Sequence, residues 1–255
     1  MRGFNNFVEI TKEFVLKYPI RKVNTNPTYY AVIIEPRKHP NFEYVCKNIL
    51  RFTGEHWGLH IFHGTQNEAF VKSALKGVSN VIYTNLGVAN LNIGNYNNLL
   101  VDTQNFYDKI KSDYFLVFQT DSCLLREGID EFMQYDYVGA PWDANTFGNG
   151  GLSIRGKKMC IQICKTYKRE RLPEDVFFSR NMKLEKANLP TWNKAAEFSI
   201  ENCAGRYIPI GVHKVGILNV RIPNFKDVYR KIFEGSEENI EYPKFLGDTT
   251  ILKYD

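Results

Sequence analysis

Several large classes of protein leave marks that this 255-residue sequence does not carry. No apolar stretch is long enough to cross a bilayer. The first residues form an amphipathic helical pattern with Glu9 and Glu13 inside it, which is unlike a signal peptide. The five cysteines include no C-x-x-C pair, and an odd number is unlike a disulfide framework. We therefore expect a protein of the cytoplasm without a membrane span.

Common catalytic and nucleotide-binding motifs are missing as well. The sequence has no Walker P-loop, no G-x-S-x-G and no convincing catalytic cysteine, and no G-x-G-x-x-G follows its first strand. His56 and His60 have the spacing of zinc ligands on a helix, but a predicted strand would separate them. The net charge of +5 favours an anionic ligand mildly, without the concentrated basic stripe of a nucleic-acid-binding protein.

The most informative stretch that is present runs from Tyr114 to Leu125. Five consecutive apolar residues are followed abruptly by polar ones, which is typical of a strand buried on both faces of a parallel sheet. Ligands of open α/β sheets bind beyond the carboxyl ends of such strands, so Asp121 should lie at the mouth of a site. A carboxylate there suits a divalent cation bound to a phosphate. The alternative is that Asp121 only caps a following helix.

Before this stretch, buried-strand patterns alternate with helical patterns. We predict strands at 29–37, 57–62 and 80–84, and helices at 1–20, 42–52, 69–75 and 96–110. This alternation is typical of βαβ units, and it predicts the α/β class with a mostly parallel central sheet flanked by helices. The carboxyl ends of parallel strands share one rim, which should carry Glu35, Gly64, Thr84 and Asp121.

Nothing in the composition demands a second domain. We predict a single domain over residues 1–255, with an N-terminal helix and linker at 1–28, a core at 29–215 and a C-terminal helical extension at 216–255. After the Tyr114 strand the regular alternation stops, and short stretches dense in Gly and Pro follow. We expect that half to face the ligands.

Three later stretches have a functional and a plain interpretation each. The glycines of Gly148–Arg155 permit close approach to a ligand, or simply form a tight turn. In Pro173–Ser179, a helix start, Asp175 is a general base or merely complements the helix dipole. His213 is a metal ligand or an ordinary histidine, and Lys214 beside it is a candidate phosphate partner. The residues alone leave these alternatives open.

Taken in order, six motifs resemble one family. They are FQTDSCLL, FMQYDYVGAPW, GNGGLSIR, PEDVFFS, FSIE and IPIGVH, and the match as a whole covers roughly residues 29–215. The family they resemble is a poorly characterised group of glycosyltransferase-like proteins with a GT-A-like fold. Each motif is weak by itself, but six in the same order are strong evidence of membership.

This resemblance implies a nucleotide-sugar-dependent transferase and gives roles to the acids and the late histidine. Asp121 would correspond to the metal-binding acidic motif, and His213 to the distal metal or diphosphate ligand. Asp175, with Glu174 beside it, would correspond to the acidic pair that supplies the base in inverting members. GT-A enzymes have D-x-D at the metal motif, whereas this sequence has one carboxylate there, so its need for a metal stays open.

The other motifs would contact the substrates. The resemblance implies that Gly150 and Gly151 line the donor sugar and that Trp142 lies on the acceptor side. The loop from Glu35 to His39 would receive the nucleoside. The residues expected to bind the donor nucleotide, besides the two glycines, are Glu35, Arg37, His39, Gln119, Thr120 and Lys214.

We therefore predict a glycosyltransferase, a hexosyl- or pentosyltransferase, that moves a sugar from a UDP-sugar to a hydroxyl of a glycan or another acceptor. It would use Mn²⁺ or Mg²⁺ and invert the anomeric configuration. The second hypothesis is a catalytically silent nucleotide- or carbohydrate-binding module with the same fold, which the single carboxylate favours. A metal-dependent phosphohydrolase is a third and weaker interpretation, since it normally needs more carboxylates around two metals.

Overall fold

A six-stranded sheet runs through the centre of the protein. The computed structural model describes residues 2–19, 26–143, 146, 148–201, 208–214 and 225–235. The strand order is β3-β2-β1-β4-β7-β6, where β1–β4 are parallel and β7 is antiparallel to both β4 and β6. The strands are β1 (Tyr29–Glu35), β2 (Trp57–His63), β3 (Val81–Asn85), β4 (Tyr114–Phe118), β6 (Tyr137–Gly139) and β7 (Leu152–Gly156). The predicted α/β class with a mostly parallel sheet is confirmed.

The continuous apolar runs of β1 and β4 follow from burial on both faces of this sheet. Alternate side chains of a strand point to opposite faces. Ala31, Ile33 and Leu116 accordingly belong to one hydrophobic cluster, and Val32 and Val117 belong to the other. Because neither face is open to water, the strands have no polar alternation.

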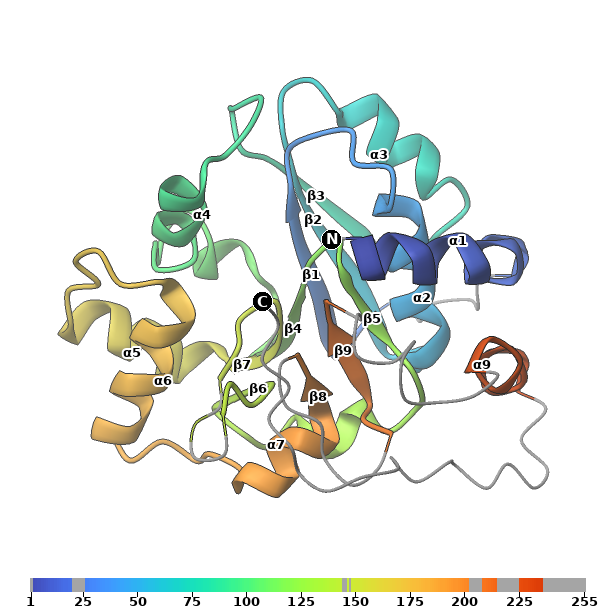
Figure 1. Ribbon diagram of the computed structural model, residues 1–255. Coiled ribbons are helices and arrows are strands. Elements are labelled where there is room, and N and C mark those ends of the chain that lie inside the picture. Colours follow the sequence, from blue (N-terminus) through green and yellow to red (C-terminus); the bar gives the residue numbers. More distant parts are fainter. Residues whose placement is uncertain are drawn as a thin grey trace.

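Helices supply the two outer layers. Figure 1 shows α1, α2 and α3 on one side of the sheet and α4, α5 and α6 on the other. None of the helices among the described residues is long and apolar enough to cross a membrane. The helices are α1 (Arg2–Lys17), α2 (Phe42–Phe52), α3 (Glu68–Ala74), α4 (Ile93–Leu99), α5 (Lys157–Thr166), α6 (Glu174–Leu184), α7 (Trp192–Phe198) and α9 (Phe225–Glu234).

The helix predicted for residues 96–110 is wrong. Helix α4 ends at Leu99, and only a short 3₁₀ turn, Tyr107–Lys109, follows. The Asp102 carboxylate accepts hydrogen bonds from the backbone N–H groups of Gln104 and Asn105, at 3.0 and 2.9 Å. Such a local side-chain acceptor competes with the helical hydrogen-bond pattern and turns the chain.

A second, three-stranded sheet joins distant parts of the sequence. Its order is β5-β9-β8, formed by β5 (Ser122–Leu124), β9 (Gly211–His213) and β8 (Ser199–Ile200). In the antiparallel pairing of β5 with β9, Ser122 lies opposite His213. This pairing brings the late histidine to the end of the central strand β4.

The ends of the described chain pack together around α2. The predicted N-terminal helix is present as α1, and the predicted C-terminal helical extension contains α9. From α2, the Asn48 side chain donates a hydrogen bond of 2.6 Å to the Tyr229 hydroxyl of α9. Most of the predicted linker (20–25) and, apart from α9 and Gly235, the predicted C-terminal extension (216–224 and 236–255) lie outside the described residues.

His60 makes the stability of this fold depend on pH. It is fully buried in β2, and its Nε2 lies 2.8 Å from the Thr84 hydroxyl. Burial, helped by the charge of Lys111, lowers the pKa of His60 to about 4. Below pH 6.5, His60 therefore becomes protonated in the unfolded chain but stays neutral in the folded chain. The free energy of unfolding falls as the pH drops from 6.5 to 4.

We expect the free energy of unfolding to lose about 3 kcal/mol through His60 over that range. Urea unfolding of the wild type and of His60→Gln at pH 7 and pH 4 measures it. The variant should lose less stability than the wild type between the two values by about this amount. An equal loss in both proteins would show that His60 is not the group responsible.

Candidate functional site

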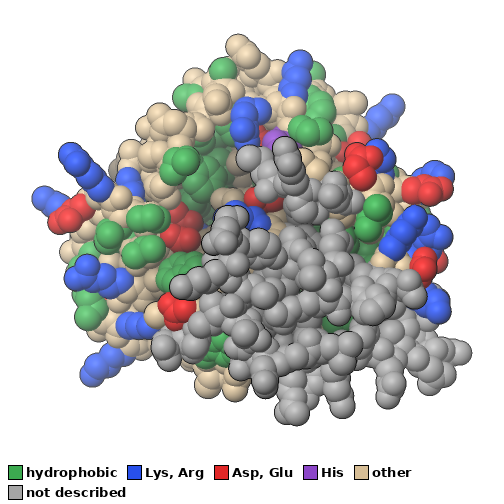
Figure 2. Space-filling model, viewed as in Figure 1, with side chains coloured by type: hydrophobic (Ala, Val, Ile, Leu, Met, Phe, Trp, Pro, Cys, Tyr) green, Lys and Arg blue, Asp and Glu red, His purple; other side chains and the backbone are tan. Residues whose placement is uncertain are grey.

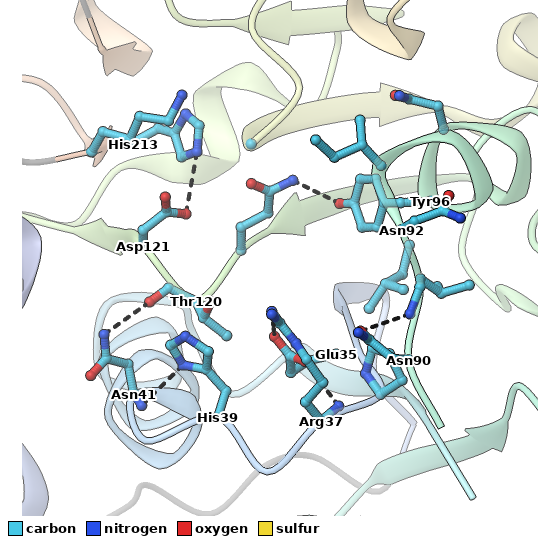
Figure 3. A pocket seen from close by; sticks show the side chains of 18 of the residues that line it. Glu35, Arg37, His39, Asn41, Asn90, Asn92, Tyr96, Thr120, Asp121 and His213 are labelled. Carbon is cyan, nitrogen blue, oxygen red and sulfur yellow. Dashed lines mark hydrogen bonds and ion pairs between the residues drawn. The ribbon is translucent and has the colours of Figure 1, made fainter. Parts of the chain in front are cut away.

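A cavity of about 660 Å³ lies at the carboxyl ends of β1 and β4. Figure 2 shows acidic, basic and histidine side chains around a hollow on this face of the molecule. In Figure 3, Asp121 and His213 face each other on one side of the cavity, whereas Glu35 and Arg37 lie on another. The residues predicted for the site that line this cavity are Glu35, Arg37, His39, Gln119, Thr120, Asp121, Gly151, Glu174, Asp175, His213 and Lys214.

Two of the predicted site residues do not line the cavity. Gly150 is absent from the lining, and a Cβ added to it would be 2.1 Å from a carboxylate oxygen of Glu174. Trp142 is half-buried in the loop after β6, and its backbone N–H donates a 3.0 Å hydrogen bond to the Thr146 carbonyl. Contact of Trp142 with an acceptor stays a prediction.

Asp121 and His213 face each other on one wall of the cavity (Figure 3), His213 buried and Asp121 half-buried. The Lys214 backbone N–H donates a 2.9 Å hydrogen bond to the Asp121 carbonyl, which extends the β5–β9 pairing to the acid. His213 Nε2 lies 3.3 Å from Asp121 Oδ1. Burial alone would raise the pKa of Asp121, but His213 and Lys214 outweigh it and lower that pKa. Burial would likewise lower the pKa of His213, but its carboxylate neighbours raise it.

A glycine makes room for the His213 ring. A Cβ on Gly151 would lie 2.3 Å from His213 Nε2, so any larger residue would displace the imidazole. The Ser122 hydroxyl fixes this glycine by donating a 2.7 Å hydrogen bond to its carbonyl. The family resemblance implied that Gly150 and Gly151 line the donor sugar, which stays a prediction; in the structure, Gly151 leaves the space that the His213 ring occupies.

Glu201 is a site-forming residue for which the sequence analysis gave no role. It follows β8, its side chain is buried, and its Oε1 lies 3.3 Å from His213 Nδ1. Lys214 Nζ donates to the same oxygen at 2.7 Å, and Asn149 Nδ2 donates to Oε2 at 2.7 Å. Burial favours a raised pKa, but His213 and Lys214 lower the pKa of Glu201. The available signal was an acid directly after a short buried strand in the FSIE motif.

Glu174 is held by a buried arginine. Arg155 is fully buried in β7, and its Nη2 lies 3.2 Å from Glu174 Oε1 and 3.1 Å from Oε2. The guanidinium carbon lies 5.4 and 5.3 Å from the ring centroids of Tyr137 and Phe178, and Nε donates to the Ser153 hydroxyl at 3.1 Å. Burial raises the pKa of Glu174, and Arg155 opposes that rise.

Asp175 is the more accessible acid of the pair. Helix α6 begins at Glu174, whose backbone N–H donates a 3.1 Å hydrogen bond to the Asn97 side chain of α4. Asp175 is half-buried, lines the cavity and accepts a 2.8 Å hydrogen bond from the Val176 N–H. Burial would lower the pKa of Lys214, but Glu201 raises it. The negative charge of Asp175 contributes to that rise.

The opposite wall carries an ion pair and a row of amides. Glu35 is buried at the end of β1 and binds Arg37 through Nε and Nη2, both at 2.8 Å. Gln119 donates a 2.8 Å hydrogen bond to the hydroxyl of Tyr96 in α4. The sequence analysis did not predict the α4 side of the cavity, where an Asn-rich segment was its only signal. The lining residues there are Asn90, Leu91, Asn92, Ile93, Tyr96 and Asn97.

The residues that could hold a divalent cation are Asp121 and His213. A carboxylate oxygen and an imidazole nitrogen are suitable ligands for Mn²⁺, and their 3.3 Å separation lets both reach one ion. Among the described residues, no cluster of three or more His, Cys, Asp or Glu side chains suits a metal. The pair therefore fits a cation that takes its other ligands from a phosphate and water.

Comparisons with solved structures show the fold. Mouse xyloside xylosyltransferase 1 in its apo form has a TM-score of 0.51 at 11% identity, over 76% of this chain and 100% of that chain. The apo-form glycosyltransferase GlyE of Streptococcus pneumoniae TIGR4 has a TM-score of 0.48 at 10% identity, over 87% of this chain and 66% of that chain. The chain thus spans slightly less than two thirds of this GlyE chain. The fold is GT-A-like.

Sequence comparisons identify the family. A search of curated proteins finds no match. A family model matches residues 83–213, which is just over half of the chain and includes Asp121, Asp175 and His213. The chain therefore belongs to the family described as "Protein of unknown function (DUF5672)".

Proposed function

We propose that the protein is a glycosyltransferase that moves a sugar from a nucleotide-diphosphate donor, a UDP-sugar, to a hydroxyl acceptor. The observation that carries the proposal is that Asp121, Asp175 and His213, from three distant segments, line one cavity in a GT-A-like fold. Asp121 and His213 are suited to hold the diphosphate through a cation, and Asp175 is suited to contact an acceptor hydroxyl.

The charges of the cavity support dependence on a divalent cation. The Lys and Arg side chains among the described lining residues are Arg37 and Lys214, and Arg37 is paired with Glu35 and Lys214 with Glu201. A diphosphate that enters alone would meet a surplus of negative charge. When bound by Asp121 and His213, Mn²⁺ or Mg²⁺ would neutralise the charge that develops on the departing diphosphate. The carboxylates among the described lining residues are Glu35, Asp121, Glu174 and Asp175.

In the proposed reaction, the Asp175 carboxylate takes the proton of the acceptor hydroxyl as its oxygen attacks the anomeric carbon. The bond from that carbon to the diphosphate oxygen breaks, and attack from the opposite face inverts the configuration. Lys214, whose side chain is 55% exposed, can turn toward the diphosphate as it leaves. Arg155 keeps Glu174 in an ion pair, so Asp175 is the better base.

The nucleoside is proposed to bind along the loop from Glu35 to His39. Two hydrogen bonds to Glu35 hold the Arg37 guanidinium, and a planar guanidinium held in this way is suited to stack on the base of a nucleoside. The donor sugar would then lie near Gly151. The acceptor side is assigned to Trp142 by the family resemblance alone.

Calorimetry with UDP, in the presence of Mn²⁺ or of a chelator, tests this proposal. We expect UDP to bind at least about tenfold more tightly with Mn²⁺, because the cation offsets the carboxylates of the cavity. UMP, which has no diphosphate, should gain little. Absence of binding by UDP and by every other nucleoside diphosphate tested would contradict the proposal.

A catalytically silent nucleotide-binding module is the second candidate. The single carboxylate of the Gln119-Thr120-Asp121 motif favours it, as does the lack of a three-ligand cluster among the described residues. Two results together would favour the module over the enzyme. They are a UDP affinity that does not change with Mn²⁺, and no hydrolysis of, or sugar transfer from, several nucleotide-sugar donors.

A further inference from the structure

We propose that Glu201 is the positioning residue that orients both His213 and Lys214 toward the diphosphate, an inference that rests on the proposed function. Glu201 does not line the cavity, and its side chain is only 6% exposed. It therefore acts through its neighbours rather than by touching a substrate.

The contacts of Glu201 fix both ends of its carboxylate. Oε2 accepts the 2.7 Å hydrogen bond from Asn149, whose own Oδ1 accepts a 3.0 Å hydrogen bond from the Gly151 N–H. Oε1 is shared by His213 Nδ1 at 3.3 Å and Lys214 Nζ at 2.7 Å. One carboxylate thus connects the glycine loop to the histidine and the lysine of the site.

The consequence for His213 is a fixed ring orientation. Because Nδ1 faces Glu201, Nε2 faces Asp121, and its ring lies against Gly151. A carboxylate at one imidazole nitrogen is the common means by which proteins orient the other nitrogen toward a metal. Glu201 occupies that position here.

Lys214 is held through both its backbone and its side chain. Lys214 has φ of +58°, a left-handed conformation that non-glycine residues adopt only when their surroundings enforce it. Its backbone N–H is bonded to the Asp121 carbonyl, and its ammonium group to Glu201. The two bonds place the side chain at the edge of the cavity, where it stays 55% exposed.

Two readouts test this role, and the first needs no metal. In Glu201→Gln, which keeps the shape but removes the charge, the ring ¹⁵N signals of His213 should shift in NMR spectra of the free protein. Loss of the corresponding signals in His213→Asn assigns them. Unchanged ring signals in Glu201→Gln would overturn the inference, whatever the protein binds.

The second readout is Mn²⁺ affinity with saturating UDP, measured from the EPR signal of free Mn²⁺. We expect Glu201→Gln to bind Mn²⁺ about 10- to 100-fold more weakly. Glu197→Gln is the matched control, because Glu197 lies nearby on α7 but is paired with Lys194 outside the cavity. It should change the affinity less than twofold. A Glu201→Gln affinity within twofold of wild type would overturn the inference.

The outcomes separate this inference from the proposed function. If wild-type protein binds no Mn²⁺ with UDP while the ring signals shift in Glu201→Gln, the cation-dependent function fails and the positioning of His213 stands. If Glu201→Gln does not fold, Glu201→Asp keeps the charge but shortens the side chain by one methylene. Glu201→Asp should shift the ring ¹⁵N signals of His213. Unchanged signals in this variant would overturn the inference.

Discussion

The Asp175→Asn variant is expected to bind UDP and Mn²⁺ as tightly as the wild type, yet to transfer sugar about 10²–10⁴-fold more slowly. An amide keeps the size of the side chain, but it cannot take the proton of the acceptor hydroxyl. Binding should persist because the diphosphate is assigned to Asp121 and His213 and not to Asp175, although all three line the cavity. The measurements are the transfer rate at saturating donor and calorimetric UDP binding.

Two further variants sharpen this test. Asp108→Asn makes the same chemical change at an exposed residue outside the cavity, and it should transfer sugar at the wild-type rate. Asp121→Ala should lose both Mn²⁺-dependent UDP binding and transfer, since it removes the proposed cation ligand. Full activity in Asp175→Asn would show that Asp175 is not the base. Full activity in both Asp175→Asn and Asp121→Ala would contradict the proposed mechanism as a whole.

The Arg155→Met variant is expected to lose about 3–5 kcal/mol of unfolding free energy. Arg155 and Glu174 have side chains 0% and 5% exposed, so removal of one partner leaves the other as an uncompensated buried group. The aliphatic side chain of Met can keep the packing against Tyr137 and Phe178, which isolates the loss of charge. Urea denaturation of single and double variants measures the effect.

A double-mutant cycle distinguishes the ion pair from general disruption of the core. The double variant Arg155→Met/Glu174→Gln should be more stable than the sum of the two single changes predicts, because no buried charge is left alone. Lys12→Met, whose partner Glu9 is exposed, should change stability by less than about 1 kcal/mol. Strict additivity in the cycle would refute the coupling of Arg155 and Glu174.

The sequence predicts the part of this fold that depends on local patterns. The apolar runs of β1 and β4 are long because both faces are buried, and their polar ends, Glu35 and Asp121, lie at one rim as parallel strands require. The helix predicted at 96–110 was wrong because the Asp102 carboxylate accepts hydrogen bonds from the backbone N–H groups of Gln104 and Asn105, which turns the chain. Hydrophobic spacing does not reveal such a turn.

The parts that the sequence could not predict depend on contacts between distant segments. Pairing of β5 with β9 brings His213 to Asp121, and no local pattern around either residue indicates it. Only the order of motifs, through family resemblance, linked them. Arg155 and Glu201 were missed as individual residues because each acts through a buried partner, and burial of a charge becomes visible only in three dimensions.

The most direct test of the account is a crystal structure of the protein grown with UDP and Mn²⁺. We predict an ion bound to Asp121 Oδ1, His213 Nε2 and diphosphate oxygens, the uridine along the loop from Glu35 to His39, and Asp175 facing the space beyond the diphosphate. A complex with the diphosphate outside this cavity, or with Asp121 and His213 still bound only to each other, would contradict it.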